Sequence, residues 1–227
     1  MTLQDKIKEI KLSFRVMMDG VVAGSMRDKG IDYRLNWGVT LPRLQAHAEE
    51  LKRDLSLSDS QQNYQQDGQE HDNPFTAYDL AIALWKENVR ECKILATLLM
   101  PPEKMLPEVC DIWMEQISSQ EIAEQAAFNL WQYLPYAPAK AYQWIADERE
   151  YYQLCGFHVL SRLFMNGQCP NERGINEYLD QALAAMQSSQ MAVRKAAMNS
   201  VLRFADLGIV YERMAKSAMK SANLDIF

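Results

Sequence analysis

The sequence predicts an all-α protein built from stacked helix pairs, an α-α superhelix of the kind that HEAT-like and ARM-like repeats form. Three observations support this fold class. The stretch 80–100 joins an amphipathic helix to a helix that is apolar on most faces. Similar helix pairs recur along the rest of the chain. No sustained alternation of polar and apolar residues indicates a strand.

The stretch LAIALWKENVRECKILATLLM, residues 80–100, forms the predicted αα-hairpin. Apolar residues recur at helical spacing from Ala77 to Trp85, and a polar turn follows at 86–88. The second helix, from Val89 onward, is apolar nearly all the way round. Such a helix is normally buried between neighbours, and one hairpin cannot cover it. The pattern therefore predicts further helix pairs on both sides.

Before this hairpin, the sequence predicts three helices. The first covers 2–18 and ends or bends at Gly20, where a short second helix begins. A connector rich in aromatic residues leads to a third helix, with Thr40 as its N-cap and Pro42 in its first turn. Residues 54–73 contain many glutamines and few apolar residues. We therefore expect mostly a polar surface loop there, with part of the segment extending the helix.

After the hairpin, proline, glycine and capping residues divide the chain into seven further helices. They are expected at about 105–117, 120–133, 139–146, 147–164, 171–187, 191–206 and 209–221. Ser119 and Asp147 are predicted N-caps, and Asn166-Gly167 closes one helix. The second helices of the pairs begin at intervals of about 31, 30 and 41 residues. This spacing is compatible with HEAT-like repeats of roughly 40 residues, some shortened, in one domain over 1–227.

The composition limits the possible functions. Of the 227 residues, 48% are hydrophobic, which is enough to bury a full core. No apolar run is long enough to span a membrane, and the N-terminus lacks the apolar core of a signal peptide, so we expect a cytoplasmic protein. Four dispersed cysteines predict buried, reduced thiols, and the histidines do not cluster with them. We therefore expect no metal site and no cofactor.

The net charge of −6 argues against general affinity for nucleic acid, but the charge is unevenly distributed. From Ser189 to the end of the chain, six basic residues stand against three acidic ones, a local balance of +3. The basic residues are Arg194, Lys195, Arg203, Arg213, Lys216 and Lys220. A basic face that binds phosphates and an ordinary solvated helix surface both agree with this distribution.

Two features have both a functional and a structural interpretation. Glu121 and Glu124 lie about one turn apart at a helix start. A carboxylate there can stabilise a developing cation, yet acidic residues are common in first turns because they complement the helix dipole. Trp37 lies in a predicted loop beside Tyr33 and Arg34. It can stack on a base or a protein, or pack against the N-terminal helices.

Four segments carry a likeness to a known family. They are the hairpin at 80–100, the WGVTLPRL segment at 37–44, Trp144-Ile145-Ala146, and Val201-Leu202-Arg203 with Ala205. Together, in this order and spacing, they resemble the DNA alkylation repair family, the AlkD-like HEAT-repeat DNA glycosylases, over about 26–206. The resemblance implies a C-shaped solenoid whose concave basic face holds double-stranded DNA. In active members it implies removal of N3- or N7-alkylated purines, assisted by an aspartate and flanking tryptophans.

The chain departs from that family at the expected active site. The family's Trp-Asp-x-x-Asp turn corresponds to 120–124, where Gln120 replaces the tryptophan and Glu124 replaces the catalytic aspartate. Glutamate keeps the charge on a longer arm, and a misplacement of about 1 Å can cost a large factor in rate.

The other expected positions are also altered. An arginine that contacts phosphate falls at Leu154, and a second tryptophan falls at Ser200 or Asn199, whereas Arg203 is retained. Two hypotheses follow. Either the protein is a glycosylase in which Glu124 is catalytic, or it is a non-catalytic HEAT-repeat scaffold that binds DNA structure or a protein partner. The residues expected to bind DNA are Gln120, Arg194, Lys195 and Arg203.

Overall fold

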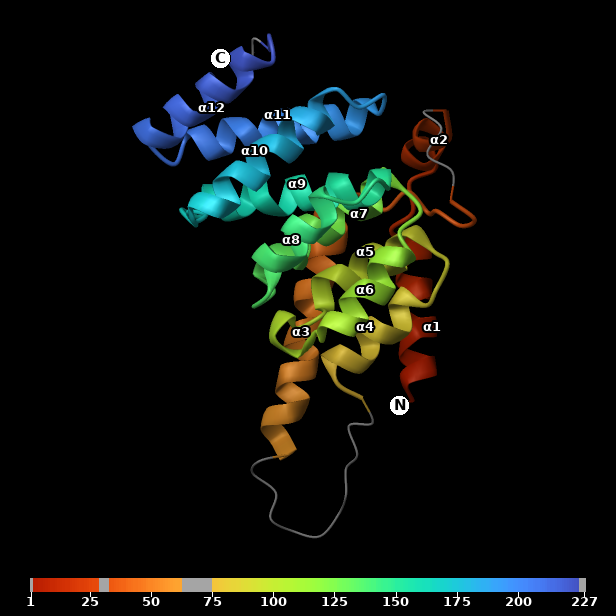
Figure 1. The fold of residues 1–227 in the computed structure, drawn as a ribbon. Helices are drawn as coiled ribbons and strands as arrows, with labels where there is room; N and C mark the ends of the chain where they lie inside the picture. Colours follow the sequence, from red (N-terminus) through yellow and green to blue (C-terminus); the bar gives the residue numbers. More distant parts are fainter. Residues whose placement is uncertain (1, 29–32, 63–74, 225–227) are drawn as a thin grey trace. The chain divides into compact units, whose positions relative to one another are not determined.

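The computed structural model describes residues 2–28, 33–62 and 75–224, and over these ranges it contains helices and no strand (Figure 1). The predicted all-α class is therefore confirmed. The chain divides into two compact units, Met1–Met105 (unit 1) and Leu106–Phe227 (unit 2). The single domain expected over 1–227 stays a prediction.

Unit 1 contains five α-helices and a short 3-10 helix in its described part. They are α1 (Leu3–Val16), α2 (Gly20–Asp28), α3 (Leu41–Gln62), α4 (Ala77–Trp85), α5 (Arg90–Leu99) and the 3-10 helix η1 (Pro102–Lys104). Capping boxes begin α1 and α4, where Thr2 and Thr76 exchange hydrogen bonds with an aspartate three residues later. Helix α5 packs against α3 and α4 and is buried on most faces, as the sequence predicted.

Helix α3 continues through part of the predicted loop. It ends at Gln62, so residues 54–62 are the part of this segment that extends the helix, as expected, and residues 63–74, where a loop was expected, lie outside the described residues. The apolar side of the helix extends one more turn, from Leu51 to Leu55, and both side chains are buried. This burial stabilises the helical part of a segment that is otherwise rich in polar residues.

A buried ion pair fastens the connector between α2 and α3 to α5. Arg90 and Glu91 are only 1% and 0% exposed. Glu91 Oε1 accepts hydrogen bonds from the backbone N–H groups of Trp37 (3.1 Å) and Val39 (3.3 Å). Arg90 Nη1 donates to the Val39 carbonyl (2.8 Å) and to Glu91 Oε1 (3.2 Å). Between the two amides, Gly38 has a φ of +72°, a conformation that favours glycine.

Trp37 itself packs against the first helix. Its ring centroid lies 5.7 Å from that of Phe14, and the side chain is half-buried. Of the alternatives considered from the sequence, packing against the N-terminal helices is therefore the one observed.

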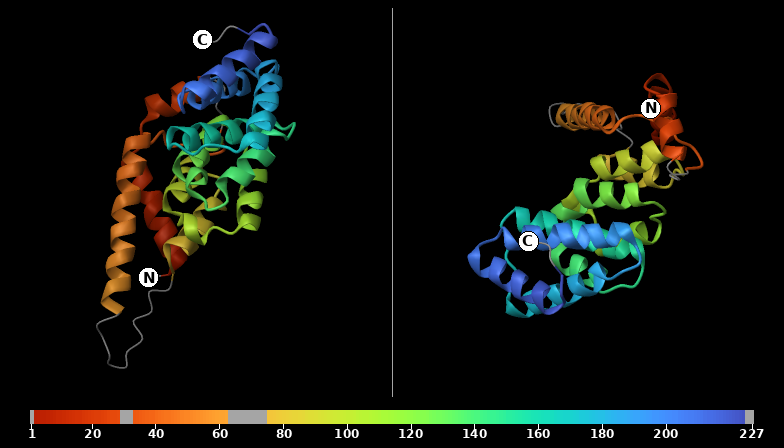
Figure 2. Two further views of the ribbon diagram at one scale, coloured as in Figure 1. Left: turned by 60° about the vertical axis from the view of Figure 1, so that its left-hand side comes forward. Right: turned by 90° about the horizontal axis from the view of Figure 1, so that it is seen from above.

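Unit 2 contains seven α-helices and one 3-10 helix over residues 106–224. They are α6 (Pro107–Glu115), α7 (Gln120–Asn129), η2 (Trp131–Tyr133), α8 (Ala137–Ile145), α9 (Glu150–Met165), α10 (Glu172–Met186), α11 (Met191–Ala205) and α12 (Ile209–Ser221). Helix α9 is central, because it packs against α7, α8 and α11 (Figure 1). Helix α12 packs beside α11 at the C-terminal end of the unit (Figure 2).

Close packing of α8 on α9 depends on Gly156. A Cβ atom at this position would lie 2.6 Å from Ile145 Cγ2 and 2.9 Å from the carbonyl oxygen of Ala141. Beside this contact, the rings of Trp131 and Trp144 lie 4.8 Å apart in the core. Both tryptophans are fully buried and form part of the core of unit 2.

One predicted cap is confirmed and one is wrong. The Ser119 side chain caps α7 by accepting a hydrogen bond from the Ile122 N–H at 3.3 Å. Helix α9 begins only at Glu150, with Arg149 at its N-cap. Asp147 instead accepts hydrogen bonds from the backbone N–H and guanidinium of Arg149 in the turn before the helix.

Three of the four cysteines, Cys92, Cys110 and Cys155, are buried, as expected, whereas Cys169 is exposed. Cys169 is exposed because it follows the end of α9 in the loop before α10. In the described part of the chain, no helix has the length and apolar character that crossing a membrane requires.

Candidate nucleic-acid interface

The first turns of α7 present the predicted pair Gln120 and Glu124. The Gln120 side-chain amide donates to Glu124 Oε1 at 2.7 Å, as expected for residues four apart on one helix face. The Glu124 side chain is 31% exposed. The carboxylate is therefore partly open to solvent, with one oxygen held by the neighbouring amide.

Helix α9 brings His158 next to this carboxylate. His158 Nε2 lies 4.0 Å from Glu124 Oε1 and has no hydrogen-bond partner among the residues that the structure describes. Burial, together with the smaller effect of the nearby charge of Arg162, lowers the pKa of His158 to about 4. The imidazole is therefore neutral at pH 7, and its contact with Glu124 is not an ion pair.

An aromatic ring and a guanidinium complete the surroundings of Glu124. Phe128, one turn after Glu124, meets His158 edge to face, with ring centroids 4.9 Å apart. The Arg162 guanidinium carbon lies 4.6 Å from the centroid of the Phe128 ring, a cation–π contact. We refer to Gln120, Glu124, Phe128, His158 and Arg162 as the Glu124 cluster.

Sequence reasoning missed three members of this cluster. The sequence does contain a signal for each helix. Glu124 and Phe128 are four residues apart, and so are His158 and Arg162. The spacing shows that each pair shares one helix face. It does not show that α7 and α9 place these faces together, because that contact is tertiary.

Of the aligned positions for the family's other groups, Leu154 and Ser200 lie in the core, whereas Asn199, the alternative to Ser200, is exposed. Leu154 is 1% exposed, so a side chain there faces inward. Ser200 is also buried and accepts a hydrogen bond from the Tyr178 hydroxyl at 2.8 Å. Two turns beyond Leu154, Arg162 supplies a guanidinium on the same helix, partly exposed.

The predicted DNA-binding residues on α11 have different surroundings. Arg194 donates to the backbone carbonyls of Ser188 (2.6 Å) and Ser189 (3.0 Å), which ties it to the preceding loop. Arg203 pairs with Asp206 at 2.9 Å on the surface. Lys195 is exposed, and no ion pair to it is found within the described ranges. The three residues do not form one cluster with Glu124.

Helix α12 adds further cations. Lys216 pairs with Glu212 at 2.6 Å. Arg213 and Lys220 are exposed and form no ion pair over the part of the chain that the structure describes. We call Lys195, Arg213 and Lys220 the free cations of α11 and α12. A similar search for a metal site, made over the described residues, finds no group of three or more His, Cys, Asp or Glu side chains.

The Glu124 cluster and the free cations can interact with different chemical groups. The Glu124 cluster combines a partly exposed carboxylate with an aromatic ring, an arrangement that can stabilise a cation. The free cations can contact phosphates of a nucleic-acid backbone without reading its sequence.

Comparison with known proteins identifies the family. The sequence profile described as DNA alkylation repair enzyme matches residues 10–221. None of the curated proteins is significantly similar in sequence. One solved structure is described as "A new family of proteins related to the HEAT-like repeat DNA glycosylases with affinity for branched DNA structures". It matches with a TM-score of 0.74 at 16% sequence identity, over 95% of this chain and 82% of that chain, which confirms the predicted helical-repeat fold. The chain thus belongs to the DNA alkylation repair enzyme family.

Proposed function

We propose that the protein binds double-stranded DNA through the free cations of α11 and α12. The observation that carries this proposal is the charge pattern over 189–224. Six basic residues lie there against two acidic ones, Asp206 and Glu212, and each acid is already paired with one base. Lys195, Arg213 and Lys220 are left to meet phosphates. Neutralising phosphates releases condensed counterions, which favours binding.

Arg162 supplies a fourth cation. Its guanidinium is held over Phe128 and pairs with no carboxylate in the described residues. Because the ring restrains its position, less side-chain entropy is lost when it binds a phosphate. With three or four phosphate contacts, the logarithm of the affinity for duplex DNA should fall with the logarithm of salt concentration with a slope of about −3.

The acidic residues elsewhere in unit 2 confine DNA binding to the surface that carries the free cations. Over 106–227 the chain has 10 basic and 14 acidic residues, so the unit as a whole repels DNA. Affinity is therefore expected to depend strongly on a few cations. It should also be largely independent of base sequence, because the contacts are to phosphates.

A charge-reversal experiment tests this proposal. Fluorescence anisotropy measures binding of a labelled duplex to the wild type, to the Lys195→Glu/Arg213→Glu variant, and to Arg173→Glu as a matched control on α10. We expect the double variant to lose binding by at least about tenfold at low salt and the control to keep it. Equal binding by all three proteins would refute the proposal. A four-way junction is included as a probe, since the structural neighbour is described as having affinity for branched DNA.

A second candidate function is excision of an alkylated base at Glu124. It is supported by the position of the partly exposed Glu124 carboxylate beside Phe128 and His158. An N3- or N7-alkylated purine is cationic, so a carboxylate can stabilise the charge that develops as the glycosidic bond breaks, and an aromatic ring can lie against it. Glu124→Gln removes the charge and keeps the size.

The assay for excision is release of free base from alkylated duplex DNA. We expect release by the wild type and none above background by Glu124→Gln, with equal DNA affinity for both proteins. If the wild type releases no base while it binds DNA, the protein is a non-catalytic DNA-binding scaffold.

A further inference from the structure

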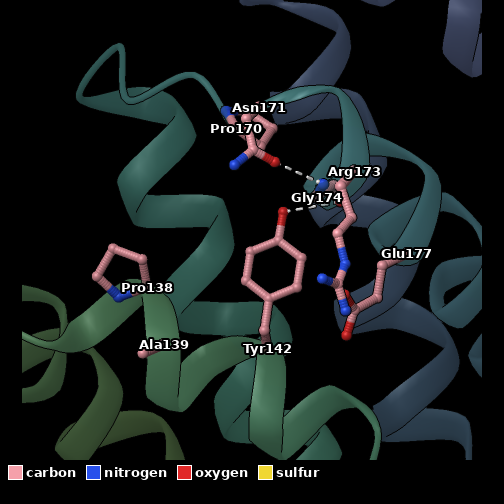
Figure 3. A pocket seen from close by; sticks show the side chains of 8 residues that line it. All are labelled: Pro138, Ala139, Tyr142, Pro170, Asn171, Arg173, Gly174 and Glu177. Atoms are coloured by element: carbon pink, nitrogen blue, oxygen red, sulfur yellow. Dashed lines mark hydrogen bonds between the residues drawn. The ribbon is translucent and has the colours of Figure 1, made fainter.

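A groove of about 390 Å³ lies between the N-terminal halves of α8 and α10 (Figure 3). It uses helices other than those of the Glu124 cluster and the free cations. Tyr142 stands in its centre, and the Tyr142 hydroxyl donates to the Gly174 carbonyl at 3.0 Å. A Cβ atom on Gly174 would lie 3.1 Å from that hydroxyl, so the glycine allows the close approach. The ring of Tyr142 is thus held in a fixed position.

The groove is lined by the rings of two prolines and of Tyr142. Pro138 comes from the start of α8 and Pro170 from the turn before α10, and both line the groove around Tyr142 (Figure 3). Burial raises the pKa of Tyr142 to about 12, so the hydroxyl stays protonated and keeps its hydrogen bond. Flat, rigid apolar surfaces of this kind bind extended chains with little loss of entropy.

The polar groups of the groove are mostly donors. Arg173 forms no ion pair over the described residues and offers up to five N–H groups. Asn171 Oδ1 is occupied because it accepts from the Gly174 N–H at 2.8 Å, which leaves its amide N–H groups free to donate. Glu177, one turn after Arg173, contributes the single carboxylate.

This chemistry selects one kind of occupant. A chain rich in proline has backbone carbonyls that accept hydrogen bonds but lacks many N–H groups, so it matches a groove with surplus donors. In the polyproline II conformation its rings pack on aromatic surfaces. A basic residue beside the prolines would meet the Glu177 carboxylate. A nucleic-acid backbone fits less well, because the Glu177 carboxylate would repel its phosphates.

We propose that this groove binds a proline-rich segment of a partner protein in the polyproline II conformation, with a basic residue of that segment against Glu177. The partner would then be recognised on α8 and α10, independently of any DNA on α11 and α12.

Peptide binding with a charge swap tests the proposal. The probe is a fluorescein-labelled peptide of about ten residues with prolines at PxxP spacing and one arginine, and a second peptide carries glutamate in place of the arginine. The full-length protein should bind the arginine peptide, and Tyr142→Ala should weaken this binding by at least about tenfold. Glu177→Lys should weaken binding of the arginine peptide and strengthen binding of the glutamate peptide. Glu172→Lys, an exposed residue of α10 outside the groove, is the matched control and should change neither.

Three results would overturn the proposal. They are no binding of either peptide to the wild type, equal binding of a peptide whose prolines are replaced by alanine, and no exchange of preference in Glu177→Lys. The charge swap keeps the test decisive even if Tyr142→Ala fails to fold. Displacement of the peptide by duplex DNA would also count against it, by assigning the groove to nucleic acid. Glu177→Lys should leave duplex binding unchanged, so this result is independent of the proposed DNA-binding function.

Discussion

Replacement of Glu91 by glutamine should weaken unit 1 far more than replacement of a surface glutamate. Glu91 is fully buried, and its Oε1 atom accepts from two backbone N–H groups and from Arg90. Its Oε2 atom has no hydrogen-bond partner in the described part of the structure. Glutamine keeps the shape, removes the charge from these hydrogen bonds, and replaces one of the two buried carboxylate oxygens with an amide NH₂ group, which is a donor.

The size of the effect follows from these contacts. Hydrogen bonds to a charged group contribute about 1.5–3 kcal/mol each, and a buried donor without an acceptor costs about 1–3 kcal/mol. Part of each hydrogen bond survives in glutamine, so we expect a loss of about 3 kcal/mol in the free energy of unfolding. For a chain of this length that corresponds to a fall of roughly 6–12 °C in Tm.

Urea unfolding and hydrogen exchange measure this prediction together. Glu87→Gln is the control, because Glu87 pairs with Lys11 at 2.5 Å on a partly exposed surface, and such pairs contribute less than about 1 kcal/mol. In Glu91→Gln, the amides of Trp37 and Val39 should also exchange faster, since Glu91 holds both. A loss below about 1 kcal/mol, with unchanged exchange at these amides, would refute the reasoning.

Three further predictions concern unit 2. Gly156→Ala should cost about 1–3 kcal/mol in thermal or urea unfolding, because the new Cβ would lie 2.6 Å from Ile145 Cγ2, and an unchanged stability would show that α8 can move away. The pKa of His158 is about 4 in the folded protein, below its ordinary 6.5, so the unfolded chain takes up a proton first as the pH falls. The contribution of His158 to the free energy of unfolding is therefore complete above about pH 6.5 and falls by roughly 3 kcal/mol as the pH is lowered toward 4. Urea unfolding of His158→Phe should lack this part of the pH dependence. Lys195→Ala should reduce the salt slope of duplex binding by about 1, equally for different base sequences, and an unchanged slope would exclude Lys195 from the phosphate contacts.

The helices of this protein could be predicted because their signals are local. The stripe from Ala77 to Trp85 and the cap at Ser119 each depend on residues within one or two turns. One predicted cap was wrong, because the side chain of Asp147 accepts hydrogen bonds from Arg149 in the same turn instead of capping α9. How far α3 extends into the polar segment 54–73 could not be predicted from composition, and the buried side chain of Leu55 supports that extension.

The candidate site could likewise be predicted from the sequence only in part. Glu124 and Gln120 were identified because the family pattern places an acid and its neighbour at this turn. Phe128 and Arg162 could not be identified, because the sequence does not specify that α7 and α9 pack with these faces together. The groove around Tyr142 has no sequence signature either, since its residues come from two helices and a turn more than thirty positions apart.

The all-α class, the starts of the main helices, the family likeness and the excess of basic residues after Ser189 can all be recognised in the amino-acid sequence. These properties depend on periodicity, capping and composition, which are features of neighbouring residues. Which of the basic side chains can bind a phosphate depends on how the helices pack. The tertiary structure ties Arg194 to backbone carbonyls, pairs Arg203 with Asp206, and leaves Lys195 open. The free energy of a charge depends on what surrounds it in space, and that is fixed only when the helices pack.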